Sequence, residues 1–273
     1  PGANMNYEKV LEKTGIAAVC QDLGIEVVRF ESFKPSEKNR FIYTGLADEV
    51  EMIINLPKLK THSLTGLTLG VKNIFGLIPG SNKVSFHREY PNNTMLGRKI
   101  YEFYSLFHDK VVTLLDGIIA HEGDGPSRGS PKQIGMVACS EDTIALDLAV
   151  TKLIGFDSTF CKTNVVDKEY ELVMDNDICF DRLKVPVSMK VHIPDGIKRW
   201  VSNKIYVKPF ILQDSCIKCG LCMKSCPASA LEYKNNNFTI LDKRCIECFC
   251  CHEVCESDAI VLKRSILHRV FVK

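Results

Sequence analysis

The chain has 273 residues, of which 45% are hydrophobic, and its formal net charge at pH 7 is +2. This length suits one large domain plus a small one, and the near-neutral charge argues against a general nucleic-acid-binding protein. No stretch approaches the roughly 20 apolar residues of a membrane-spanning helix and no secretory signal opens the chain, so we expect a cytoplasmic protein that binds neither membrane nor nucleic acid.

The N-terminal region is expected to contain two helices and a strand. Apolar residues at helical spacing predict a helix from Asn6 to Thr14 and a shorter one from Ala17 to Leu23, each followed by glycine. Ile25 to Phe30 is rich in β-branched residues and predicts a strand. Glu31 to Arg40 is polar and contains a proline, which predicts a loop or turn.

A basic stretch follows a short buried strand predicted from Glu51 to Leu56. Between Asn55 and Lys99 there are seven Lys or Arg residues and one acid, Glu89. Several of these cations fall at the end of the predicted strand and in the turn after it, and ligands bind at that edge of open α/β sheets. The glycine-rich stretch from Leu64 to Leu77 predicts a short helix with turns at its ends.

The middle of the chain predicts a helix, two strands and a second helix, with a long loop between the strands. The helix spans Gly97 to Phe107, and the strands span Val111 to Leu115 and Ile134 to Cys139. Ile118 to Lys132 is the predicted loop. The second helix runs from Thr143 to Ile154, with Asp142 as its N-cap and Gly155 as its stop.

Candidate site residues come from the basic stretch and from these later elements. We predict that Lys58, Lys72 and His87 bind an anion and that Lys60, His62 and Asp147 are catalytic. Asp116, Glu122 and Asp124 are further acid–base or metal-ligating candidates. The alternatives are a solvated face for the basic run, an ordinary structural role for His62, and capping or pairing with a lysine for Asp147.

The last part of the chain carries two cysteine runs with the same spacing. They are Cys216, Cys219, Cys222 and Cys226, followed by Cys245, Cys248, Cys251 and Cys255. This pattern is typical of bacterial ferredoxins with two [4Fe–4S] clusters, in which the last cysteine of each run ligates the other cluster. It predicts one cluster on Cys216, Cys219, Cys222 and Cys255 and a second on Cys245, Cys248, Cys251 and Cys226. Zinc is a weaker alternative, because zinc sites use four ligands in two pairs, and disulfides are weaker still.

The other cysteines are assigned no metal. Cys250 lies inside the second run but breaks its spacing, so we expect it to be unligated. The remaining four are scattered singly and are interpreted as small buried hydrophobic residues. This use of thiols is typical of a reducing cytoplasm and favours an organism that lives at low oxygen.

Two more segments complete the domain prediction. Val187 to Ile193 alternates and predicts a strand, and Ile197 to Val207 contains the only tryptophan and leads into the cysteine module. We therefore expect an α/β, Rossmann-like domain over residues 1–207, followed by a small α+β ferredoxin-like domain over residues 208–273.

Several sequence blocks together resemble a known family. They are Asn55 to His62, Gly70 to Asn73 with Phe75 and Gly76, Asp116 with Gly117, Glu122 to Pro126, Ala145 to Asp147, and Leu153 to Gly155. With the C-terminal cysteine runs, they resemble the uncharacterised Fe–S centre proteins, also described as domain of unknown function 362. The resemblance implies the fold and the clusters rather than a reaction. Because family members usually carry a further N-terminal α/β stretch, it also implies that Pro1 lies inside a longer natural protein.

We expect an iron–sulfur electron-transfer protein whose two clusters relay electrons to or from a partner protein or a small anionic substrate held by the α/β domain. Two alternatives remain. One is a reductase, an iron–sulfur oxidoreductase that acts on a small anionic substrate. The other is a non-redox assembly or maturation factor that hands over metal or a cluster.

Overall fold

The computed structural model describes residues 7–79, 83, 86, 89, 90, 92–125, 128–175, 180–186 and 206–265. The strand predicted from Val187 to Ile193 lies outside these residues, as does nearly all of the tryptophan-containing segment before Val207. Within the described residues, no helix combines the length and the apolar character needed to cross a bilayer.

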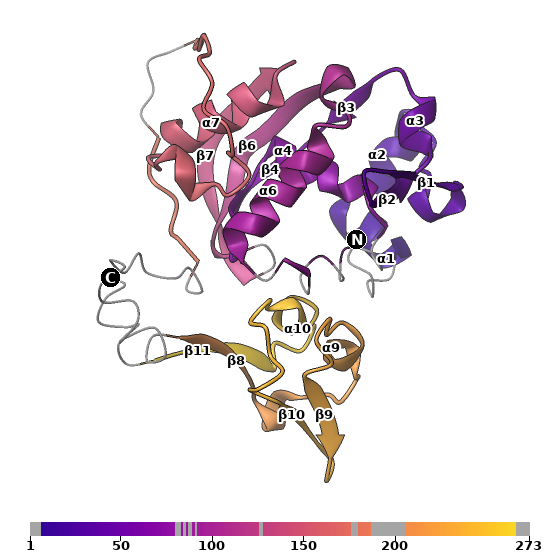
Figure 1. Ribbon diagram of the computed structural model, residues 1–273, viewed down its shortest axis with the longest axis vertical. Coiled ribbons are helices and arrows are strands. Elements are labelled where there is room, and N and C mark those ends of the chain that lie inside the picture. Colours follow the sequence, from indigo (N-terminus) through magenta and orange to yellow (C-terminus); the bar gives the residue numbers. More distant parts are fainter. Residues whose placement is uncertain are drawn as a thin grey trace.

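A five-stranded mixed sheet is the centre of the α/β domain (Figure 1). Its strands are β3 (Ile53–Asn55), β4 (Lys58–His62), β5 (Gly66–Thr68), β6 (Val111–Asp124) and β7 (Arg128–Ser140). β3 and β4 run parallel to β6, whereas β7 pairs antiparallel with β6 and β5 pairs antiparallel with β4. The α/β class is therefore confirmed.

Helices pack on this sheet and on one another. They are α4 (Gly70–Ile74), η2 (Phe75–Leu77), α6 (Asn93–Tyr104), η3 (His108–Lys110), α7 (Thr143–Leu153) and η4 (Ser158–Phe160). Leu146 and Val150 of α7 pack in a core with Leu59 and Leu115 of the sheet. As predicted, the Asp142 side chain caps α7 by accepting hydrogen bonds from two backbone N–H groups of its first turn.

The N-terminal region differs from its prediction in two places. Its elements are α1 (Tyr7–Thr14), α2 (Ile16–Asp22), η1 (Phe30–Ser32), β1 (Pro35–Lys38), β2 (Phe41–Thr44) and α3 (Leu46–Glu49). The strand predicted from Ile25 to Phe30 is wrong, and the predicted loop from Glu31 to Arg40 contains β1. Asn39 and Arg40, both with positive φ, make the two-residue turn into β2. The polar β1 lacks the apolar alternation of a half-buried strand, because most of its side chains are exposed.

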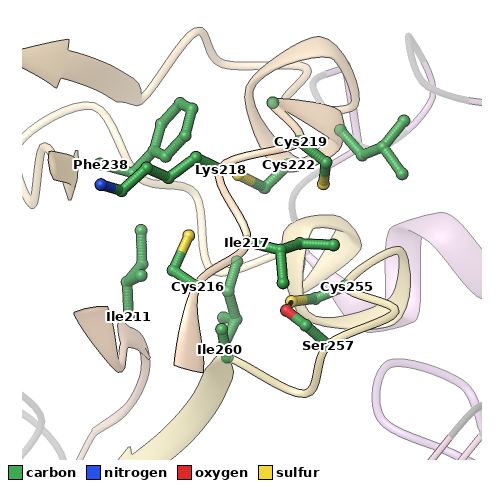
Figure 2. Close-up of a pocket in the computed structure, with 13 residues that line it drawn as sticks. Ile211, Cys216, Ile217, Lys218, Cys219, Cys222, Phe238, Cys255, Ser257 and Ile260 are labelled. Atoms are coloured by element: carbon green, nitrogen blue, oxygen red, sulfur yellow. Dashed lines mark hydrogen bonds between the residues drawn. The ribbon is translucent and has the colours of Figure 1, made fainter. Parts of the chain in front are cut away.

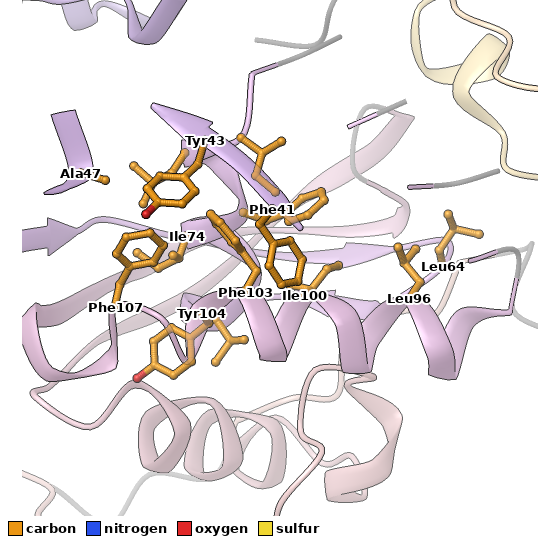
Figure 3. Close-up of a cluster of buried hydrophobic side chains, with 14 of the residues drawn as sticks. Phe41, Tyr43, Ala47, Leu64, Ile74, Leu96, Ile100, Phe103, Tyr104 and Phe107 are labelled. Carbon is orange, nitrogen blue, oxygen red and sulfur yellow. The ribbon is translucent and has the colours of Figure 1, made fainter. Parts of the chain in front are cut away.

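An aromatic core joins this hairpin to α6 (Figure 3). The ring centroids of Phe41 and Phe103 are 5.2 Å apart, and those of Tyr43 and Phe107 are 5.1 Å apart. Offset or edge-on aromatic pairs at such distances add about 1 kcal/mol each to the gain from burial. The hairpin is thereby held on α6.

The loop predicted from Ile118 to Lys132 is also wrong in large part. β6 continues to Asp124 and β7 begins at Arg128, so the two strands form one long hairpin. Its register shifts between Gly117 and Ile119. The glycines and charged residues of this segment do not predict a strand. Its pairing with β7 and β4 decides its conformation.

The small domain is built from two hairpin-like pairs and two one-turn helices. Its elements are β8 (Val207–Ile211), η5 (Gln213–Ser215), α9 (Leu221–Lys224), β9 (Leu231–Lys234), β10 (Asn237–Ile240), α10 (Cys250–Glu253) and β11 (Ile260–Arg264). β8 pairs with β11 and β9 pairs with β10, both antiparallel. In Figure 1, α10 lies on the side toward the α/β domain, whereas the β9–β10 hairpin points away.

Candidate metal centres

Four cysteines line one cavity in the small domain. Cys216, Cys219 and Cys222 come from the first run, and Cys255 comes from the end of the second. Figure 2 shows these thiols together with the apolar side chains of the wall, among them Ile211, Phe238 and Ile260. Thiols set in an apolar wall are the surroundings that a sulfur-ligated metal cluster requires.

A second cavity has the complementary set of cysteines. Cys226 comes from the first run, and Cys245, Cys248 and Cys251 come from the second. The structure thus brings together the same two sets of four thiols that the spacing predicts, while their ligation of metal stays a prediction. The Cys250 thiol donates a hydrogen bond to the carbonyl oxygen of Cys248 at 4.0 Å.

The two cysteine loops repeat one backbone conformation. The second residue after the first cysteine of each run has a positive φ, 58° at Lys218 and 54° at Glu247. Two positions later, Gly220 and Phe249 have φ values of 74° and 62°. A positive φ costs a non-glycine residue on the order of 1–2 kcal/mol, so its recurrence indicates two loops shaped for the same task. Each loop leads directly into α9 or α10, which carries the third cysteine of its run.

Burial opposes the ionisation of two of the cavity thiols. Burial and the neighbouring cysteines raise the pKa of the Cys222 thiol to about 11. Burial raises the pKa of Cys251 for the same reason. Bound metal stabilises such thiolates. Among the described residues, no group of three His, Cys, Asp or Glu side chains is arranged to hold a metal ion.

Charged residues meet where α10 faces the α/β domain. Glu253 ends α10 and interacts electrostatically with Lys60 on β4 and Lys72 on α4. Burial raises the pKa of Glu253 to about 7, and the two lysines oppose this shift. Burial lowers the pKa of Lys72 to about 8 and also lowers the pKa of Lys60. The structure thus brings the two lysines together with an acid that the sequence analysis did not single out.

Phe249 connects the second cavity to the α/β domain. Its ring forms part of the cavity wall and is only 5% exposed. The same residue belongs to the hydrophobic cluster that contains Leu64, Phe103 and Val207. The small domain therefore packs its second cysteine loop against the core of the large one.

Two predicted residues of the basic stretch have structural partners. The Lys58 amine pairs with Asp116 at 2.6 Å on an exposed part of the sheet. His62 is buried, and its Nδ1 accepts hydrogen bonds from the backbone N–H groups of Leu64 and Thr65 at 3.1 and 3.3 Å. The predicted turn is wrong here, because Lys58 to His62 form strand β4. His87 lies outside the described residues.

Asp147 of α7 is fully buried, and its side chain lies at the start of α4. Its two carboxylate oxygens accept hydrogen bonds from the backbone N–H groups of Gly70 at 2.8 Å and Val71 at 3.0 Å. Burial raises the pKa of Asp147 to about 7, and these hydrogen bonds oppose the shift. This geometry supports the capping interpretation of Asp147.

The other two acidic candidates, Glu122 and Asp124, also lie on β6. Glu122 accepts a hydrogen bond from the backbone N–H of Lys184 and pairs with the Lys184 amine at 3.2 Å. Asp124 ends the strand. Glu253 was missed because no spacing rule marks a single charged residue in a cysteine loop. A charged side chain between two predicted ligands was the available signal for Glu253.

Comparisons with known proteins divide the chain in the same order. Residues 1–152 match the model of the family described as "Domain of unknown function (DUF362)", and residues 208–256 match the "4Fe-4S dicluster domain". The thylakoid-associated protein sll1697 of Synechocystis sp. is 35% identical over 153 residues, which is 54% of this chain and 47% of that protein. The match thus spans about half of the relative's length. No solved structure is similar enough to match.

Proposed function

Because the chain belongs to the DUF362 family and carries a 4Fe-4S dicluster domain, we propose that it is an electron-transfer protein whose α/β domain holds the acceptor or donor of the electrons. The dicluster domain supports an iron–sulfur role directly. The proposal adds the number of clusters, their ligands and the place where electrons are exchanged. It also takes residues 208–273 as the electron-carrying unit and residues 1–207 as the unit that binds the partner or substrate.

We assign one [4Fe–4S] cluster to each cysteine-lined cavity. Cys216, Cys219, Cys222 and Cys255 hold the first, and the remaining four cysteines of the two runs hold the second. When bound, such clusters exchange single electrons, at potentials that the surrounding hydrogen bonds, charge and exposure tune over about −700 to +450 mV. The free thiols of the described cysteines accord with a reducing, cytoplasmic setting.

The observation that carries this proposal is the position of the second cavity. Phe249 is shared between its wall and the hydrophobic cluster of the α/β domain. By contrast, the loop around the first cavity presents an exposed thiol at Cys219 and an Ile217 side chain that is 66% exposed. The first cavity is therefore the one that an external redox partner reaches, and the second is the one nearest the α/β domain.

A second candidate, a reductase acting on a small anionic substrate, is favoured by one further observation. Lys60 and Lys72 are half-buried at the same interface, beside the loop of the second cavity. Amines in such a position attract carboxylate or phosphate groups. In a reductase the α/β domain would hold a small anionic substrate, whereas in an electron carrier it would hold the electron donor or acceptor.

The test is metal analysis and spectroscopy of anaerobically purified full-length chain. We expect about eight iron and eight sulfide per chain, as two cubane clusters require. Reduction should give an EPR spectrum of two interacting one-electron centres. Cys216→Ser should remove one centre and leave the other, and Cys139→Ser, at an exposed thiol of the sheet, is the matched control. Zinc in place of iron, or a single centre in the wild-type protein, would overturn the proposal.

A further inference from the structure

Three charged side chains face one another across the contact between α10 and the α/β domain. Lys60, Lys72 and Glu253 are each half-buried, and Glu253 interacts electrostatically with both lysines. Lys83 adds a further positive charge near Lys72, and Glu31 adds a negative charge near Lys83. Lysines outnumber acids in this group by three to two, so the group has one net positive charge when all five are ionised.

The protein does not pair these charges directly. Among the described residues, neither the Lys60 amine nor the Lys72 amine forms a hydrogen bond or an ion pair within 4.0 Å, and the same holds for the Glu253 carboxylate. Neither amine is among the fully buried polar atoms that lack a partner, so both ammonium groups reach open space. They are free to donate hydrogen bonds to water or to a bound group.

A buried hydroxyl group lies beside Lys60. β4 and β5 pair so that Lys60 is opposite Thr68, which places their side chains on the same face of the sheet. Thr68 is only 6% exposed, and its Oγ1 has no hydrogen-bond partner among the described residues. An unpaired buried hydroxyl costs about 1–3 kcal/mol. Two independent features, the unpaired amines and the unpaired hydroxyl, thus lie at one place.

We propose that Lys60, Lys72 and Thr68 form a binding site for the oxyanion group of a small molecule, a carboxylate or a phosphate, closed by Glu253 of the cysteine-rich domain. The two ammonium groups and the hydroxyl donate to the anion. Glu253 faces the same space and accepts a hydrogen bond from a hydroxyl or amine elsewhere on the ligand. A role of this site in electron transfer rests on the function proposed above, whereas anion binding at this site does not.

The charge balance narrows the class of ligand. One net positive charge suits a small anion with one or two negative charges, whereas Glu253 and Glu31 would repel a long polyanion. Glu253 lies two residues after Cys251, which lines the second cavity. A ligand held here would be next to the loop of the inner cluster, which is the place that an electron acceptor or donor must occupy.

Anion binding can be measured without any redox readout. Full-length chain, purified anaerobically with its clusters, would be titrated in a calorimeter with inorganic phosphate and, separately, with acetate. We expect one site per chain for at least one probe, with a dissociation constant below about 1 mM. Lys60→Met and Lys72→Met should each weaken binding at least about tenfold, as loss of a charge-assisted hydrogen bond predicts.

Two further variants separate binding from folding. Lys99→Met, at a lysine of α6 that pairs with Glu102, is the control and should leave the affinity unchanged. Thr68→Val keeps the side-chain shape and removes the unpaired hydroxyl, so it should weaken binding while leaving the melting temperature equal or higher. A purely structural threonine would behave in the opposite way, with a lower melting temperature and unchanged affinity.

The outcomes distinguish this site from the proposed function. Wild-type protein that binds neither probe, or Lys60 and Lys72 variants that bind like wild type, would overturn the site while iron and EPR analysis still tests the clusters. Anion binding that persists in a protein shown to lack two clusters would support the site and overturn the electron relay. Loss of affinity only in the three site variants, in protein with full iron content, is the result that we expect.

Discussion

Replacing Asp147 with asparagine tests how the α/β domain positions Lys72. The carboxylate is fully buried and accepts two hydrogen bonds from the first residues of α4, the helix that carries Lys72. Asparagine keeps one acceptor oxygen and turns an NH₂ group toward the other backbone donor. One hydrogen bond is lost and a buried backbone N–H is left unpaired, so we expect a loss of about 1–3 kcal/mol in the free energy of unfolding.

The size of this loss should depend on pH. Burial raises the pKa of Asp147 from 3.8 to about 7 in the folded protein. The folded state therefore keeps a proton that the unfolded state releases, so the carboxyl group stabilises the fold most below pH 3.8 and loses this contribution as pH rises through 7. Each pKa unit corresponds to about 1.4 kcal/mol, and asparagine does not titrate. The advantage of wild type over Asp147→Asn should thus be about 1.4 kcal/mol smaller at pH 8 than at pH 6.

Urea unfolding at pH 6, 7 and 8 measures this difference, with circular dichroism following the α/β domain and visible absorption following the clusters. Asp157→Asn is the matched control, because Asp157 also caps a helical turn but is exposed. Hydrogen bonds from Thr159 lower the pKa of Asp157, so its contribution is lost on acidification instead. A wild-type advantage over Asp147→Asn that does not change with pH would show that the buried carboxyl group is ionised throughout, and the reasoning would fail.

Three other substitutions give sharp expectations. Cys248→Ser should remove one of the two EPR centres and about half of the iron, whereas Cys250→Ser should leave the iron content unchanged; equal losses from both would contradict the assigned ligands. Gly70→Ala would place a Cβ 2.4 Å from Thr143 Cγ2 and 3.1 Å from Asp147 Oδ1, so unfolding should become easier by about 1–3 kcal/mol; an unchanged urea midpoint would show that the contact relaxes freely. Lys58→Ala breaks an ion pair whose two side chains are 45% and 51% exposed, so it should lower the free energy of unfolding by less than about 1 kcal/mol. Anion affinity should stay unchanged, and a large loss of affinity would show that Lys58 belongs to the anion site.

Local sequence patterns were enough to predict the helices and strands that carry strong local signals. The helix at Thr143 to Leu153 begins after Asp142 because that side chain accepts hydrogen bonds from the first backbone N–H groups. Such an N-cap can be recognised from the local sequence alone. β1 and the second half of β6 carried no such signal. Their polar and glycine-rich residues adopt strands because a neighbouring strand accepts their hydrogen bonds, and that partner is not visible in a local window.

The site shows the same division. The repeated cysteine spacing by itself determined which four thiols come together around each cavity, because in runs of this ferredoxin type the last cysteine of each run joins the other set. Only the tertiary structure decided that Glu253 faces Lys60 and Lys72, and that Asp147 bonds to a helix 77 residues earlier in the chain. Buried charges interact through space, so the residue that balances each one is chosen by the packing of distant segments and not by its neighbours in sequence.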